Sequence, residues 1–304
     1  MNILEHPNLR RFFSYLDTNA DSSPVIFDCD GTIIKGDVGE SMLYYQIEHF
    51  LFRRSPADIW ADFPDRKVLS GLFQSLERVP AEERDTHPSF PPFADAILDW
   101  YFGQIDAGQV AKACTDIVRL FSGYTTSEVR TIAAESFAGE LGAAVGMRTL
   151  GRRTLPRGIR YIHESLELLR ALIGRNVELW VVSGSSKWSV EPVFEPLGIP
   201  AGQVIGIELV EEDGRLTDTG VTPVPIREEK VAAFRRHSSR TPILVASDSR
   251  NDIPLFRIAS RLKVRINSRG RSSKEFFDDI GEHPNGSWVN VEKPTILAQG
   301  EQDA

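Results

Sequence analysis

Val25-Ile26-Phe27-Asp28-Cys29-Asp30-Gly31-Thr32 is the stretch that decides how this chain of 304 residues folds. Its first three residues are apolar, and such β-branched and aromatic side chains favour a short buried strand. Two carboxylates follow, and the alternation of side chains along a strand directs Asp28 and Asp30 to the same side. Converging carboxylates repel each other unless a cation or a shared proton lies between them. The stretch therefore predicts a strand whose carboxyl end carries a metal site or acid–base chemistry.

Two other interpretations of this stretch are open. It could be an EF-hand loop, but Gly31 lies too early for the loop glycine, and Gly39 stands where the final glutamate ligand is required. It could also be an acidic turn at the end of a strand, with no chemistry. Cys29 lies between the two aspartates, and we expect it to point away from Asp28 and to pack as a small apolar side chain.

The composition is that of a folded protein with room for two domains, since 41% of the residues are hydrophobic. The net charge of -8 argues against nucleic-acid binding, which requires a basic face. No apolar run reaches membrane-spanning length, and residues 1–24 lack the apolar segment of a signal peptide. The two cysteines, Cys29 and Cys114, argue against a disulfide framework and fit a reducing compartment. We therefore expect a cytoplasmic protein with no nucleic-acid or membrane partner; its oligomeric state is not indicated.

The periodicity of apolar residues changes along the chain. It predicts a helix over residues 7–16, and from residue 40 to about 150 it is helical with no convincing strand. Helices are expected there over 41–52, 56–79, 93–105, 108–121 and 127–141, and an interruption of the second at Pro64 is left open. The later elements are expected to be a helix over 161–173, a strand over 178–182, a helix over 190–197, a strand over 204–210, a hairpin turn at 212–214, a helix over 228–237, a strand over 242–246, a helix over 253–259 and a last strand over 262–266. This alternation predicts an α/β fold, with a mostly parallel sheet, helices on both faces and an added all-helical segment.

Polar residues follow the predicted strands where a parallel sheet binds its ligands, at the carboxyl ends. One strand ends in Ser183-Gly184-Ser185-Ser186, and another ends in Ser247-Asp248-Ser249-Arg250-Asn251-Asp252. Asp248 and Asp252 are spaced to reach one hard cation, and Mg²⁺ is generally held by one or two carboxylates beside a phosphate. Helix capping by the serine or by the aspartates is the alternative at each place.

In this order, the motifs resemble those of the haloacid dehalogenase-like (HAD) phosphohydrolases, in which Asp-x-Asp-x-Thr closes the first strand of a Rossmann-like sheet. The resemblance implies that Asp28 is the nucleophile that becomes an aspartyl-phosphate and that Asp30 is the general acid and base. It implies that Thr32, Ser183 and Gly184 belong to the phosphate site.

The resemblance also implies the cationic groups of the site. Lys230 would neutralise the nucleophile and the phosphoryl group, with Arg227 as the fallback. Mg²⁺ would be the cofactor, and its ligands would be Asp28, Asp30 through its carbonyl, Asp248 and Asp252. Ser247 stands where the family usually has glycine.

The predicted domain organisation follows from the same resemblance, which includes a helical C1-type cap closing over the site. We expect four divisions of the chain. They are an N-terminal helix that packs on the core (residues 1–20), the catalytic core (21–39 and 155–298), the cap (40–154) and a tail (299–304). An ordinary helical bundle domain is the other interpretation of the cap segment.

The resemblance is to the phosphoserine and phosphocholine phosphatases within the family. There an acidic residue nine places after the nucleophile enters the substrate pocket, and Asp37 holds that place; capping of the next helix by Asp37 is the alternative. Aromatic residues beside Asp37 and Glu40 would suit an ammonium group. The expected function is Mg²⁺-dependent hydrolysis of a small phosphomonoester such as phosphoserine, phosphoethanolamine or phosphocholine. A phosphomutase or phosphotransferase of the same fold, or a catalytically silent binding module, stays open.

Overall fold

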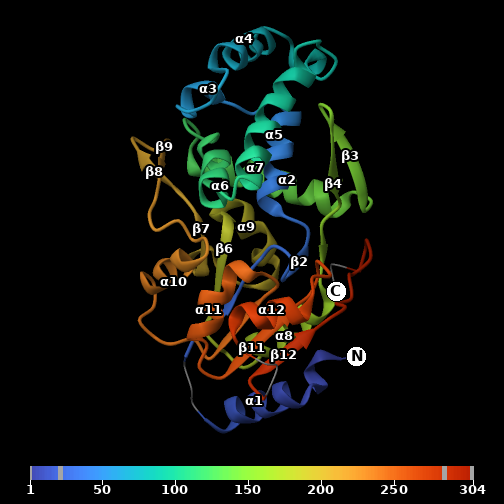
Figure 1. The fold of residues 1–304 in the computed structure, drawn as a ribbon, viewed down its shortest axis with the longest axis vertical. Helices are drawn as coiled ribbons and strands as arrows, with labels where there is room; N and C mark the ends of the chain where they lie inside the picture. The colour runs from blue at the N-terminus through green and yellow to red at the C-terminus, as the bar shows by residue number, and fades with distance from the viewer. Residues whose placement is uncertain (1, 20–22, 283–285, 302–304) are drawn as a thin grey trace.

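The fold is built on a parallel sheet at the centre of the molecule (Figure 1). The computed structural model describes residues 2–19, 23–282 and 286–301, and within them six strands pair in the order β12-β11-β10-β1-β6-β7. The strands are β1 (Val25–Phe27), β6 (Leu179–Ser186), β7 (Val204–Ile207), β10 (Leu244–Ser247), β11 (Leu262–Ile266) and β12 (Trp288–Val291). Every pairing between neighbours is parallel. The predicted α/β fold is confirmed, and β1 lies in its middle.

Both faces of the sheet are buried, as a parallel sheet requires. Alternation along β1 places Val25 and Phe27 in one apolar cluster and Ile26 in another, all at most 1% exposed. Helices of the first cluster are α1 (Pro7–Thr18), α8 (His163–Ile173) and α9 (Lys187–Phe194), and those of the second are α10 (Glu228–Arg235), α11 (Ile253–Ile258) and α12 (Ser273–Ile280). The sheet is thus the middle layer of three.

Between β1 and β6 the chain leaves the sheet and forms a helical body on the side of the molecule away from α1 (Figure 1). Its helices are α2 (Val38–Glu48), α3 (Pro56–Ile59), α4 (Arg66–Glu77), α5 (Phe90–Asp106), α6 (Val110–Arg119) and α7 (Thr126–Gly142). Buried side chains such as Tyr44, Trp60 and Phe93 form the apolar cluster of this body, which continues onto α9 and β7 through Trp188 and Ile207. The chain enters and leaves it through a two-stranded antiparallel ribbon, β2 (Ile34–Lys35) with β5 (Arg160–Tyr161).

The segment predicted to be an all-helical cap contains strands as well, so that prediction is wrong at its end. Strands β3 (Gly146–Leu150) and β4 (Arg153–Arg157) form an antiparallel hairpin there. Most of the hairpin residues are exposed or half-buried, so the strands have no buried face that requires apolar residues at every second position. The sequence therefore gives no strand signal there. The division into core and cap remains a prediction.

Other elements also differ from expectation. The strand predicted over 204–210 is two strands, β7 and β8 (Leu209–Glu212), and β8 forms the expected hairpin with β9 (Arg215–Gly220). Tyr161, predicted to begin a helix, lies in β5. Strand β11 is not the last strand, because α12 and β12 follow it.

Two predictions concern the ends of segments and membrane spans. The expected tail over 299–304 and the expected start of the core at residues 21 and 22 fall partly outside the described residues. No helix in the described part of the chain is long and apolar enough to cross a membrane.

Candidate active site

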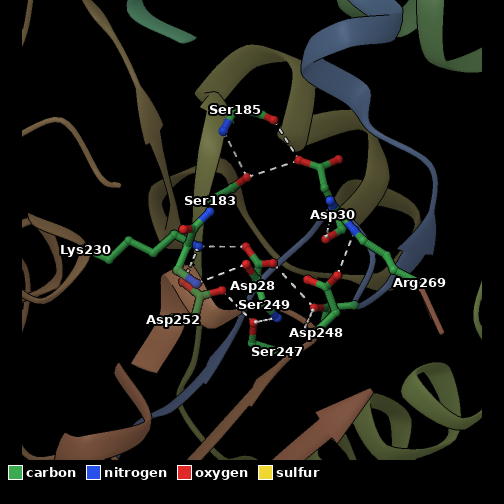
Figure 2. Close-up of polar contacts among 12 residues, drawn as sticks. Asp28, Asp30, Ser183, Ser185, Lys230, Ser247, Asp248, Ser249, Asp252 and Arg269 are labelled. Atoms are coloured by element: carbon green, nitrogen blue, oxygen red, sulfur yellow. Dashed lines mark hydrogen bonds and ion pairs between the residues drawn. The ribbon is translucent and has the colours of Figure 1, made fainter. Parts of the chain in front are cut away.

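Asp28 follows β1 and lies at the centre of a group of charged side chains (Figure 2). Its side chain is buried, and Oδ1 accepts a hydrogen bond from Nζ of Lys230 over 2.9 Å. The same ammonium group lies 2.6 Å from Oδ1 of Asp252. Burial opposes the charge on Lys230, but Asp252 and Asp28 outweigh it and raise the pKa of the lysine. Lys230 on α10 is therefore held as a cation directly beside Asp28.

Asp252, immediately before α11, has both carboxylate oxygens engaged. Oδ1 meets Lys230, and Oδ2 accepts a hydrogen bond from the hydroxyl of Ser247 over 2.5 Å. Burial raises the pKa of Asp252 to about 6, although Lys230 lowers it. The side chain does not hydrogen-bond the start of α11, so the capping interpretation does not describe Asp252. As the side chains stand, Asp252 positions Lys230.

Asp248 and Arg269 form an ion pair on the opposite side of Asp28 from Lys230 (Figure 2). Nε of Arg269 lies 2.8 Å from Oδ2 of Asp248, and Nη2 donates to the carbonyl oxygen of Asp30 over 3.4 Å. The other oxygen of Asp248, Oδ1, is buried and has no hydrogen-bond partner. Burial raises the pKa of Asp248 to about 7, although Arg269 lowers it. Arg269 was missed in the sequence; its only signal is its position shortly after β11.

The side chain of Asp30 points toward β6, the strand that pairs with β1 on the side opposite β10. Its Oδ2 accepts a hydrogen bond from the hydroxyl of Ser185 over 2.6 Å and lies 3.5 Å from that of Ser183; its Oδ1 accepts from the backbone N–H of Val38 over 2.8 Å. Burial, reinforced by Asp37, raises the pKa of Asp30 well above its usual range. A raised pKa favours the protonated form of a carboxyl group, and that form can donate a proton as a general acid. Ser185 was also missed, although it lies two residues after Ser183 on the same strand.

Thr32 is placed differently from the predicted phosphate-binding role. It is fully buried and does not line the cavity described below. Its hydroxyl lies 3.4 Å from Oδ2 of Asp28 and accepts a hydrogen bond from the backbone N–H of Asp248 over 2.9 Å. The hydroxyl of Thr32 therefore links the end of β1 to the residue that follows β10, and its part in phosphate binding remains a prediction.

A cavity of about 260 Å³ lies between the edge of the sheet and the helical body. The predicted residues that line it are Asp28, Asp30, Asp37, Ser183, Gly184, Lys230, Asp248 and Asp252. Its wall in the helical body is largely apolar and includes Leu43, Ile117 and Phe121. The structure thus brings all the predicted site residues except Thr32 to one cavity, while the fallback Arg227 does not line it.

Two acidic side chains of α2 and its cap lie on the helical side of this cavity. Asp37 caps α2 by accepting a hydrogen bond from the backbone N–H of Glu40 over 2.9 Å, so it both caps the helix and lines the cavity. Glu40 accepts hydrogen bonds from the hydroxyls of Tyr44 and Tyr101 over 2.9 and 3.2 Å. Burial, reinforced by Asp37, raises the pKa of Glu40 to about 7.

The surroundings of Asp248 fit a hard cation. Mg²⁺ takes carboxylate and carbonyl oxygens, and the unpartnered Oδ1 of Asp248 and the carbonyl of Asp30 are oxygens of this kind. As the side chains stand, no three or more His, Cys, Asp or Glu side chains of the described residues converge into a metal site. Arg269 instead bridges Asp248 and the Asp30 carbonyl.

Comparisons with known proteins relate this arrangement to a family. The sequence model of the haloacid dehalogenase-like hydrolases matches residues 101–257, more than half of the chain. No curated protein matches. Among solved structures, a protein of unknown function from Anaerococcus prevotii DSM 20548 is similar with a TM-score of 0.64 and 18% identity, over 86% of this chain and 82% of that chain. A protein of unknown function from Bordetella pertussis Tohama I has a TM-score of 0.57 and 14% identity, over 89% of this chain and 99% of that chain.

At these identities the two solved structures show a shared fold and no more. The family match covers the segment that runs from α5 through β6 and β10 to α11, and so includes Ser183, Lys230, Asp248 and Asp252. This chain belongs to the haloacid dehalogenase-like hydrolase family.

Proposed function

We propose that this protein is a Mg²⁺-dependent phosphatase that hydrolyses a small phosphomonoester through an aspartyl-phosphate on Asp28. The observation that carries the proposal is the contact between Asp28 and Lys230 at the wall of the cavity. A carboxylate can attack phosphorus, and a fixed cation beside it offsets the repulsion between the carboxylate and the phosphate dianion. Membership of a hydrolase family supports the same conclusion.

The proposed reaction has two displacements at phosphorus. In the first, an oxygen of Asp28 bonds to phosphorus, the ester P–O bond breaks, and Asp30 donates its proton to the leaving oxygen. In the second, Asp30 takes a proton from water, the water oxygen bonds to phosphorus, and the bond to Asp28 breaks to release phosphate. The hydroxyl of Ser183 lines the cavity and can donate to a phosphoryl oxygen.

Asp28, the carbonyl of Asp30, Asp248 and Asp252 are the residues proposed to hold Mg²⁺. When bound, the ion supplies positive charge that stabilises the phosphoryl oxygens during both displacements. Lys230 offsets charge on the other side of Asp28, where it is fixed by Asp252.

We extend the proposal to an ester whose alcohol carries an amine, such as phosphoserine, phosphoethanolamine or phosphocholine. Asp37, Glu40 and Tyr101 all line the cavity opposite Asp28, and carboxylates together with aromatic rings stabilise an ammonium group. The cytoplasmic location expected from the composition remains a prediction.

The proposal is tested with a generic phosphomonoester, p-nitrophenyl phosphate, in the presence of Mg²⁺ and after treatment with EDTA. We expect phosphate release that EDTA abolishes and added Mg²⁺ restores. Undiminished turnover in EDTA would contradict the metal requirement. Binding of esters without any turnover would favour a silent binding module, and transfer to an added alcohol instead of water would favour a phosphotransferase.

A further inference from the structure

We propose that Arg269 stands in for Mg²⁺ in the metal-free enzyme: it pairs with Asp248 and the carbonyl of Asp30, and the ion must displace it to bind. The inference rests on the Mg²⁺ site of the proposed function. It assigns a role to Arg269, which lies outside all of the sequence motifs.

The contacts of Arg269 are with groups proposed to hold the ion. Its Nε lies 2.8 Å from Oδ2 of Asp248, and its Nη2 lies 3.4 Å from the carbonyl oxygen of Asp30. A guanidinium group and a divalent cation both bind anionic and carbonyl oxygens. Because both carry positive charge, they cannot occupy the space beside the same two oxygens at once. Arg269 and the ion are therefore competitors for the same oxygens.

The backbone at Gly31 lies very close to the ion pair between Asp248 and Arg269. Gly31 has a φ of +79°, and a Cβ at this position would lie 2.5 Å from Oδ2 of Asp248 and 3.0 Å from Nε of Arg269. The neighbouring Ser268 donates a hydrogen bond from its hydroxyl to the carbonyl of Gly31 over 2.6 Å. Glycine at 31 leaves room for the ion pair, and Ser268 ties the loop after β11 to the loop after β1.

The distribution of charge explains why a stand-in cation is needed. The side chain of Asp248 is 1% exposed, and a buried carboxylate without a partner is strongly unfavourable. Lys230 is committed to Asp28 and Asp252 on the other side of the site (Figure 2). Arg269 is the cation paired with Asp248 among the described residues.

Arg269 is also free to leave. Its side chain is 43% exposed, unlike that of Lys230, which is 5% exposed. It borders both the cavity of the site and a second cavity of about 680 Å³, and Asp37 and Glu40 line both cavities as well. A displaced guanidinium group therefore has acidic groups near it and does not have to cross an apolar wall.

The test measures the binding of Mg²⁺ itself by calorimetry, using chelator-stripped full-length protein at about pH 9, well above the usual range of a carboxyl group. Arg269→Gln should bind Mg²⁺ about tenfold more tightly than the parent, because a charge-assisted hydrogen bond no longer has to be broken. Arg271→Gln is the matched control, since it removes the same charge from an exposed side chain two residues away. Because the charge of Arg271 acts on Asp248 from a distance and forms no ion pair with it, the affinity of this variant for Mg²⁺ should rise far less than that of Arg269→Gln.

Thermal stability gives a second readout that does not depend on activity. Arg269→Gln should lower Tm in EDTA, and the difference from the parent should vanish in saturating Mg²⁺, because the ion then pairs with Asp248 in both proteins. Arg271→Gln should leave Tm unchanged in both conditions. A Tm deficit of Arg269→Gln that persists in saturating Mg²⁺ would show a purely structural role and overturn the inference.

The other outcomes separate this inference from the proposed function. Unchanged or weaker Mg²⁺ binding by Arg269→Gln, with normal binding by the parent, overturns the inference alone. An equal gain in both variants would reduce the effect to long-range charge and also overturn it. If the parent binds no Mg²⁺, the metal requirement of the proposed function fails, and the inference fails with it.

Discussion

Nζ of Lys230 lies 2.9 Å from Oδ1 of Asp28, and this contact joins helix α10 to the end of the central strand β1. The two residues are 202 positions apart in the chain. Asp28, the proposed nucleophile, and Lys230 therefore meet only when α10 has packed on the sheet. Asp28 is also held by the hydroxyl of Thr32 on its other oxygen, so the orientation of its carboxylate is set from two sides.

Asp28→Asn is expected to remove activity and to leave the fold intact. The amide is nearly the same shape as the carboxylate, but it cannot form the aspartyl-phosphate, and kcat should fall by about 10⁴-fold or more. Phosphate release and circular dichroism measure the two effects. Asp213→Asn, in the exposed turn between β8 and β9, is the control and should keep full activity. Substantial turnover by purified, metal-loaded Asp28→Asn would rule out Asp28 as the nucleophile.

Asp252→Asn tests two roles of one carboxylate. Loss of its negative charge should raise the Mg²⁺ concentration needed for half-maximal activity. Loss of one of the two buried partners of Lys230 should lower the free energy of unfolding in EDTA by about 3 kcal/mol. Mg²⁺ titrations of activity and urea unfolding measure these effects. If stability falls while the Mg²⁺ requirement is unchanged, Asp252 only holds Lys230 and is not a ligand.

Glu40 should make the stability of the metal-free protein depend on pH. Burial raises its pKa from 4.5 to about 7, so its neutral form is favoured in the folded state. This stabilising contribution is complete below the unfolded pKa and is lost as the pH rises through 7. Thermal melts in EDTA should therefore show a smaller fall of Tm between about pH 5 and pH 8 for Glu40→Gln than for the parent.

The control for this pH experiment is Glu212→Gln, which changes an exposed glutamate in the same way. It should keep the pH dependence of the parent. The pKa of Asp248 is also raised to about 7, so Glu40→Gln should remove only part of the dependence. An identical pH profile for Glu40→Gln and the parent would contradict the role given to the burial of Glu40.

Substrate preference tests the amine hypothesis. Phosphocholine, phosphoethanolamine and phosphoserine should have higher kcat/KM than sugar phosphates, because sugars offer no positive charge to offset the desolvation of Asp37. Asp37→Ala should reduce that preference. Sugar phosphates that are hydrolysed equally well, or an Asp37→Ala variant with unaltered preference, would remove the amine from the proposal and leave the phosphatase activity untouched.

The edge of the sheet could be predicted because its signals are local. Strand β11 has the predicted bounds, with apolar residues at 262, 264 and 266. The motif residues Asp28, Ser183 and Asp248 stand at or near the ends of three apolar runs in β1, β6 and β10. Parallel strands bring those ends to one edge, so the order of motifs along the chain was enough to place them together.

Features that depend on distant partners were not predictable in this way. Arg269 lies in a polar loop after β11, and its ion-pair partner Asp248 lies before β11. Nothing in the sequence near Arg269 indicates that pairing. Thr32 looked like a phosphate ligand from its place in the motif, but the burial of its hydroxyl against Asp248 is a property of the packed sheet. The β3–β4 hairpin follows a helical run and has few buried side chains, so its hydrogen bonds left no apolar pattern in the sequence.

The ribbon formed by β2 and β5 determines how the helical body is connected to the sheet. Lys35 lies opposite Arg160, so the two ends of the helical body meet at one place beside the sheet. The helical body is therefore joined to the sheet through one pair of adjoining chain segments, and it also packs on the sheet layer, where α2 and α7 contact α9. Under the proposed function, cavity residues of the helical body would adapt the site to the alcohol of the ester, while Asp28 and Lys230 stay fixed by the sheet and α10.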